Sequence, residues 1–170
     1  LPISVVIDEC RYEGNIPWTW GNLTPEEMVN KIWLGVTNGG YVGHGDTYVT
    51  EQPLQWPEKS SDVLWWSKGG TMKGKSQDRI KFLKGIIESA PGYLSPPAIL
   101  PDLDVNNVVT YNNEYFLAYL NRDQSRYIML DLPENVNYSI EVIDAWNMTI
   151  KPLDGKYSGK CLVELPQKQM

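Results

Sequence analysis

Cysteine and histidine are scarce in this sequence: its 170 residues include two cysteines and one histidine. No group of His and Cys residues has metal-ligand spacing, so a zinc site is not expected. Nothing in the sequence supports a disulfide between Cys10 and Cys161, and two free thiols are the favoured interpretation. The absence of an apolar run of 18 residues argues against a transmembrane helix.

Basic residues are also few, and the net charge is −6 without a basic stripe along the chain. Binding to nucleic acid by neutralisation of phosphates is therefore not expected. The first residues lack the basic start and apolar centre of a signal peptide, and the sequence assigns no compartment. Because the chain begins within a strand pattern, we expect it to be part of a longer protein.

Phenylalanine is rare, with two residues, whereas there are seven tryptophans and ten tyrosines. Trp and Tyr combine a flat apolar face with a polar group, which suits stacking on sugar rings. The same residues also cover sheet faces and seams between domains, and composition alone leaves both interpretations open.

The first half of the chain predicts two βα units. An apolar run at 3–7 predicts a buried strand, and a capping box at Thr24 with Pro25 in the first turn predicts a helix that ends at 38–40. A second strand is expected over 41–49 and a second helix over 76–88, with Ser76 as its cap. Two such units leave strands that lack a neighbour on one side. Further strands or a second copy of the chain must cover these sheet edges.

The second half predicts only strands, at 107–111, 114–120, 127–132, 138–144 and 160–165. Their short, regular spacing indicates a small antiparallel β-sandwich. A segment rich in proline and glycine at 89–97 separates the halves, so we expect domains at 1–94 and 95–170. The predicted fold class is α/β followed by all-β.

Charged residues cluster directly after the first predicted strand, at Asp8, Glu9, Arg11 and Glu13. In α/β barrels the catalytic groups lie at the carboxyl ends of the parallel strands. Side chains alternate along a strand, so Glu9 shares a face with Val5 and Ile7. If those two residues fill a barrel interior, Glu9 points into its mouth and is the candidate catalytic carboxylate.

Three motifs resemble the last part of a glycoside hydrolase barrel: residues 8–14 (Asp-Glu-Cys-Arg-Tyr-Glu-Gly), 39–46 (Gly-Gly-Tyr-Val-Gly-His-Gly-Asp) and 66–70 (Trp-Ser-Lys-Gly-Gly). The pattern is similar to that of apiosidase-like bacterial hydrolases, which are related to the retaining (β/α)₈ clan that includes family 5. Residues 115–120 and 142–149 resemble the β-sandwich appended to those barrels. The resemblance implies that 3–9 and 41–46 are the seventh and eighth barrel strands and that Glu9 is the nucleophile. It also implies that the acid/base residue follows the fourth strand, outside this chain.

Six further residues are candidates for binding a sugar. Arg11 would keep Glu9 ionised, or would form a simple ion pair with it, and Glu13 would bind a hydroxyl or orient Arg11. His44, between two glycines, suits substrate binding or a structural role equally, while Asp46 would bind a hydroxyl or cap a loop. Trp65 and Trp66, on a long loop, would form a stacking wall.

The leading hypothesis is therefore a fragment of a retaining glycoside hydrolase that cleaves O-glycosidic bonds of an oligo- or polysaccharide. It needs no metal or organic cofactor, because two carboxyl groups perform the reaction. With one carboxyl group outside the chain, we expect the isolated chain to be inactive. The alternative is a non-catalytic carbohydrate-binding or structural β-sandwich module.

Overall fold

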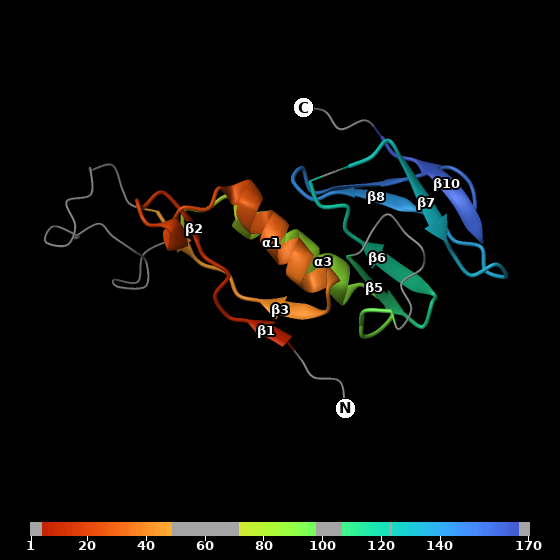
Figure 1. Cartoon of the computed structure of the whole chain (residues 1–170), viewed down its shortest axis with the longest axis horizontal. Helices are drawn as coiled ribbons and strands as arrows, with labels where there is room; N and C mark the ends of the chain where they lie inside the picture. The colour runs from red at the N-terminus through yellow and green to blue at the C-terminus, as the bar shows by residue number, and fades with distance from the viewer. Residues whose placement is uncertain (1–4, 49–71, 98–106, 123, 167–170) are drawn as a thin grey trace, which may run out of the picture.

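The computed structural model describes residues 5–48, 72–97, 107–122 and 124–166, and it has a mixed helical part followed by a part with only strands (Figure 1). The elements of the first part are β1 (Val5–Ile7), β2 (Glu13–Gly14), a 3₁₀ helix η1 (Thr19–Gly21), α1 (Pro25–Thr37), β3 (Gly40–Val42), β4 (Asp46–Thr47) and α3 (Ser76–Glu88). The elements of the second part are β5 (Val108–Tyr111), β6 (Tyr115–Ala118), β7 (Tyr127–Asp131), β8 (Glu141–Asp144), β9 (Thr149–Pro152) and β10 (Lys160–Glu164).

Helix α1 begins and ends where its local sequence predicts. The Thr24 hydroxyl accepts a hydrogen bond from the Glu27 backbone N–H (3.2 Å), and the Glu27 carboxylate accepts one from the Thr24 N–H (2.9 Å). Pro25 occupies the first turn, where its missing N–H costs no hydrogen bond. At the other end Asn38 is the C-cap and Gly39 has a φ of +80°, a conformation that glycine adopts without strain.

Helix α3 spans the predicted residues, but its N-terminus is not capped as predicted. Lys75, and not Ser76, is the N-cap residue, and its side chain makes no capping hydrogen bond. The backbone N–H groups of Lys75 and Ser76 instead donate to Glu13 of β2. The cap comes from a distant strand, so the prediction based on neighbouring residues was wrong.

The first part contains two pairs of parallel strands, as two consecutive βα units require. Strand β1 pairs with β3, with Ile7 opposite Val42, and β2 pairs with β4, with Glu13 opposite Asp46. The predicted strand 41–49 is thus divided into β3 and β4. Helix α1 packs on β3, where a Cβ at Gly35 would lie 2.2 Å from the Val42 side chain.

Strand β1 is exposed, although its apolar sequence predicts burial. The side chains of Val5, Val6 and Ile7 are 57%, 65% and 39% exposed. Within the described residues β1 pairs with β3 on one edge only, and its second edge is unpaired. The burial prediction therefore fails for this chain, because it requires neighbours on both sides of the strand.

The second part consists of antiparallel pairs, which agrees with the predicted direction of its strands. The pairs are β5 with β6, β7 with β10, and β8 with β9. Strand β9 was missed by the sequence analysis, because all four of its residues are exposed and it ends in Pro152. The arrangement of these pairs as a β-sandwich stays a prediction.

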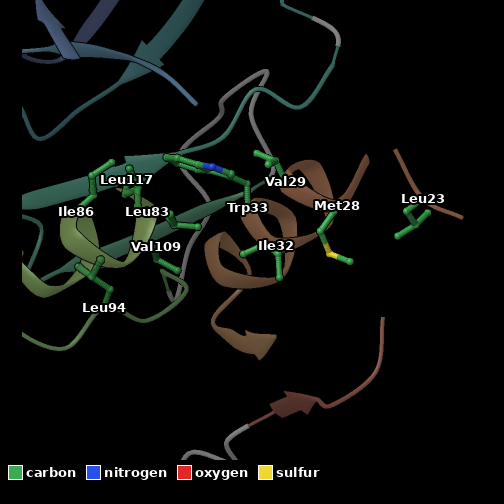
Figure 2. Close-up of a cluster of buried hydrophobic side chains, with 10 residues drawn as sticks. All are labelled: Leu23, Met28, Val29, Ile32, Trp33, Leu83, Ile86, Leu94, Val109 and Leu117. Carbon is green, nitrogen blue, oxygen red and sulfur yellow. The ribbon is translucent and has the colours of Figure 1, made fainter. Parts of the chain in front are cut away.

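One hydrophobic core joins the two parts of the chain (Figure 2). Its buried residues come from α1, α3, β5, β6 and the segments next to them: Leu23, Met28, Val29, Ile32, Trp33, Leu83, Ile86, Leu94, Val109 and Leu117. The Trp33 ring stacks on Tyr119, with centroids 5.3 Å apart, and the Tyr119 hydroxyl donates to Asn30 (2.8 Å). The core is thus continuous across residue 94, and the predicted domain boundary there stays a prediction.

Leu117→Ala tests whether the two parts unfold together. Leu117 is 4% exposed in this core, so we expect a loss of about 2–5 kcal/mol in the free energy of unfolding. Denaturant titrations followed by helical circular dichroism and by tryptophan fluorescence should show the same loss. In Leu162→Ala, the matched control, the removed side chain is 59% exposed, so the change should stay within about 0.5 kcal/mol. A helical signal that Leu117→Ala leaves unchanged would contradict a shared core.

Candidate active site

Glu9 lies just beyond the carboxyl end of β1 and is exposed. The pKa of Tyr12 is raised to about 12 by burial, by a hydrogen bond to Glu9 and by the negative charge of that carboxylate. Tyr12 packs edge-on against Trp20, with centroids 6.0 Å apart. The Tyr12 hydroxyl therefore stays protonated beside an accessible carboxylate at the strand end.

Arg11 does not lie beside Glu9 as predicted. Its φ of +81° places it in the left-handed region, which interrupts the alternation of a strand. Its guanidinium donates to Asn22 Oδ1 (2.9 Å), and the ion pairs among the described residues do not include Arg11 with Glu9. The expected ion pair of Arg11 with Glu9 is therefore absent from the described residues.

Glu13 is fully buried and accepts hydrogen bonds from three residues. Tyr48 Oη (2.8 Å) and the Lys75 N–H (2.7 Å) donate to Oε1, while the N–H (3.0 Å) and the hydroxyl of Ser76 donate to Oε2. Burial by itself raises the pKa of Glu13, but these hydrogen bonds outweigh it and hold the pKa below its usual value. Glu13 is thus an ionised carboxylate bound to the start of α3, and it does not orient Arg11.

Asp46 lies opposite Glu13 on β4 and binds the same segment of backbone. It is 2% exposed, and its Oδ2 accepts hydrogen bonds from the N–H groups of Lys73 (2.6 Å) and Gly74 (2.8 Å). A Cβ at Gly74 would lie 2.6 Å from the Glu13 carboxylate, so the close approach of backbone to carboxylate requires glycine. The two carboxylates together fix the residues that lead into α3.

His44 is partly buried in the segment between β3 and β4. Its Nε2 lies 3.0 Å from the Ser76 hydroxyl, which links the imidazole to Glu13. Burial lowers the pKa of His44, and the negative charges of Glu13 and Asp46 oppose this effect only in part. The imidazole is therefore neutral at neutral pH.

The structure brings Glu13, His44 and Asp46 together and adds three residues that the sequence analysis did not propose for the site. Tyr12, Tyr48 and Ser76 are the additions. The position of Tyr48, two residues after Asp46, could have indicated a side chain on the same face. Trp65 and Trp66 lie outside the described residues.

The cysteines and the acidic residues give no metal centre in the described part of the chain. Cys10 and Cys161 are free, as predicted, and burial raises the pKa of both thiols. Within the described ranges no three His, Cys, Asp or Glu side chains are grouped so that they could hold a metal ion. No helix in the same ranges is both long and apolar enough to cross a membrane.

The fold and the site together define a segment of parallel βα units that carries an exposed carboxylate at a strand end and is joined to antiparallel strands. A solved structure from Bacteroides vulgatus, described as a "putative glycoside hydrolase", matches 90% of this chain with a TM-score of 0.73 and 34% sequence identity. The match covers 30% of that protein, so the chain spans less than a third of its length. This chain is thus similar in sequence and fold to part of a glycoside hydrolase.

A family described as a domain of unknown function, DUF5605, matches residues 104–170, a range that includes strands β5 to β10. No curated protein gives a significant match. The similarity to a glycoside hydrolase agrees with the general resemblance seen in the sequence, whereas the apiosidase-like and family 5 relationships stay predictions.

Glu13→Gln tests the structural role of the buried carboxylate. The amide presents a donor group to backbone N–H groups that need an acceptor, so we expect a loss of at least about 2 kcal/mol in the free energy of unfolding at neutral pH. Denaturant titration measures this loss. The exposed Glu134→Gln is the matched control and should leave the free energy of unfolding nearly unchanged.

The difference in stability between wild type and Glu13→Gln should depend on pH, and the lowered pKa of Glu13 sets the direction. Because the folded pKa of Glu13 is lowered, its contribution is complete above the unfolded pKa of about 4.3 and is lost as the pH falls through the folded pKa. The difference in stability between wild type and Glu13→Gln should therefore shrink below about pH 4.3. A difference that stays constant through this range would show that Glu13 is not a stabilising ionised group.

Proposed function

We propose that this chain forms part of the active site of a retaining glycoside hydrolase, with Glu9 as the nucleophile. The observation that carries the proposal is the contrast between the carboxylates near the strand ends. Glu13 and Asp46 are buried and bound to backbone, whereas Glu9 is exposed and lies near the Tyr12 hydroxyl. Asp8 is exposed as well, but it follows β1 on the opposite face by alternation.

In the proposed reaction, Glu9 attacks the anomeric carbon and forms a glycosyl-enzyme, while a carboxylic acid protonates the leaving oxygen. That second carboxyl group then activates the water that releases the sugar with net retention. Retaining pairs are separated by about 5–5.5 Å. Since the buried Glu13 and Asp46 are committed to the start of α3, the proposal takes the acid/base from a segment outside this chain.

The open edge of β1 supports completion of the site by further polypeptide. Val5, Val6 and Tyr41 are each more than half exposed on the two paired strands. Additional parallel strands of a (β/α)₈ barrel would cover this apolar surface, and the matched solved protein is more than three times as long as the matched region. A second copy of the chain is the other candidate to cover the edge.

A non-catalytic carbohydrate-binding module is the second candidate function. An open hollow of about 500 Å³ lies between 93–97 and 110–113, and Tyr93 at its wall is 63% exposed. Tyr93, Asn112 and Asn113 line the same hollow, and an exposed aromatic ring together with polar side chains is suited to a sugar. Saturable oligosaccharide binding by the isolated chain would favour this function, whereas the hydrolase proposal locates binding at the strand ends.

Glu9→Gln tests the nucleophile in the enzyme that contains this segment. The amide cannot attack the anomeric carbon, so we expect the turnover number to fall by at least about 10³-fold while substrate binding persists. Release of reducing sugar measures turnover, and the anomeric form of the first product reports retention. The neighbouring Asp8→Asn is the matched control and should keep its turnover. Hydrolysis by Glu9→Gln at the wild-type rate would refute the assignment.

A further inference from the structure

His44 is the single histidine of the chain, and it lies alongside the segment that carries Glu9. The Gly43 N–H donates to the Ile7 carbonyl (2.9 Å), which joins the two strand ends. A Cβ at Gly45 would lie 2.5 Å from the Tyr12 ring, so these segments stay in contact beyond the strands. The backbone on either side of His44 therefore lies against the segment that carries Glu9 and Tyr12.

The hydrogen bonds around Ser76 determine which nitrogen of His44 carries the proton. Glu13 accepts from Tyr48, Lys75 and Ser76 and is ionised, so it has no proton to donate. A serine hydroxyl has one proton, and here that proton goes to Glu13 Oε2. The Ser76 oxygen can then only accept from His44 Nε2 at 3.0 Å, which means that Nε2 is protonated.

Protonation at Nε2 makes the other nitrogen an acceptor, because a neutral imidazole has one donor and one acceptor. Nδ1 of His44 has no hydrogen-bond partner among the described residues. Sugars present many hydroxyl donors, and an acceptor fixed on the segment that adjoins the one with Glu9 is suited to bind one of them.

We propose that Glu13 and Ser76 hold His44 as the Nε2–H tautomer, so that Nδ1 accepts a hydrogen bond from a hydroxyl of the sugar bound beside Glu9. The ligand part of this inference rests on the proposed function, whereas the tautomer part rests on the hydrogen bonds alone. His44 contacts the substrate, and Glu13 and Ser76 are positioning residues that act through it.

The electrostatics agree with this arrangement. Burial lowers the pKa of His44, while Glu13 and Asp46 are the charged groups that raise it. The net lowering keeps the imidazole neutral at neutral pH. A protonated imidazole would donate from both nitrogens and would offer no acceptor to a sugar hydroxyl.

Nuclear magnetic resonance of the ¹⁵N-labelled chain tests the tautomer directly, since the one imidazole gives unambiguous signals. At neutral pH we expect a protonated Nε2 and an unprotonated Nδ1. Ser76→Ala should convert this state to a mixture of tautomers, while Ser76→Thr, which keeps the hydroxyl, should preserve it. Ser89→Ala, at the other end of α3, is the matched control and should change nothing at His44.

Two results would overturn the inference: a wild-type imidazole protonated at Nδ1, or an unchanged tautomer in Ser76→Ala. The amide spectrum shows whether each variant is folded. If Ser76→Ala is unfolded, the comparison of Ser76→Thr with wild type still tests the inference. If Ser76→Thr shows the same mixture of His44 tautomers as Ser76→Ala, the hydroxyl at position 76 does not select the tautomer.

Kinetics of the enzyme that contains this segment test whether His44 binds the sugar. His44→Gln keeps an N–H near the Nε2 position but has no acceptor at the Nδ1 position, so we expect KM to rise about fivefold with a smaller change in kcat. An unchanged KM would refute the contact with sugar. Full hydrolysis by Glu9→Gln would refute the proposed function and leave the tautomer standing, so the two failures are distinguishable.

Discussion

The attachment of α3 to the strand ends is the interaction on which the rest of this site depends. Glu13 from β2 and Asp46 from β4 accept backbone N–H groups from residues 73–76, and both carboxylates are almost completely buried. Negative charge is favourable at a helix N-terminus, where unpaired N–H groups and the helix dipole both attract it. Two short strands and one helix are thereby fixed in a single arrangement, and Glu9 and His44 lie next to it.

The helices also explain why the strand-only part is joined firmly to the rest. Helix α1 contacts β3 through Gly35 and Val42, and its Trp33 stacks on Tyr119, the residue that follows β6. On α3, the Arg79 guanidinium lies 4.2 Å from the Trp146 ring centroid and donates to the Trp146 carbonyl. The two helices therefore contact both the parallel strands and residues of the strand-only part.

Features with local causes could be predicted from the sequence, and features with distant causes could not. The capping box of α1 lies within four residues, and the apolar residues Ile80, Leu83, Ile86 and Ile87 recur at helical spacing within α3, so both helices were predicted at their observed positions. The cap of α3 comes from Glu13, 63 residues before Ser76, and no neighbouring residue indicates it. Burial of β1 was predicted from its composition, but burial depends on neighbours that the described residues do not supply.

Glu9 and Glu13 are the same residue type in opposite environments, and the backbone conformation between them explains the difference. In a regular strand residues 9, 11 and 13 would share a face. The left-handed conformation of Arg11, which costs roughly 1–2 kcal/mol for a residue with a Cβ, interrupts that alternation between the two glutamates. Glu13 then enters the protein as the buried acceptor for α3, while Glu9 stays exposed near the Tyr12 hydroxyl. The proposed role of Glu9 needs access and the anchoring role of Glu13 needs burial, and the turn at Arg11 allows one short acidic segment to hold an exposed and a buried carboxylate.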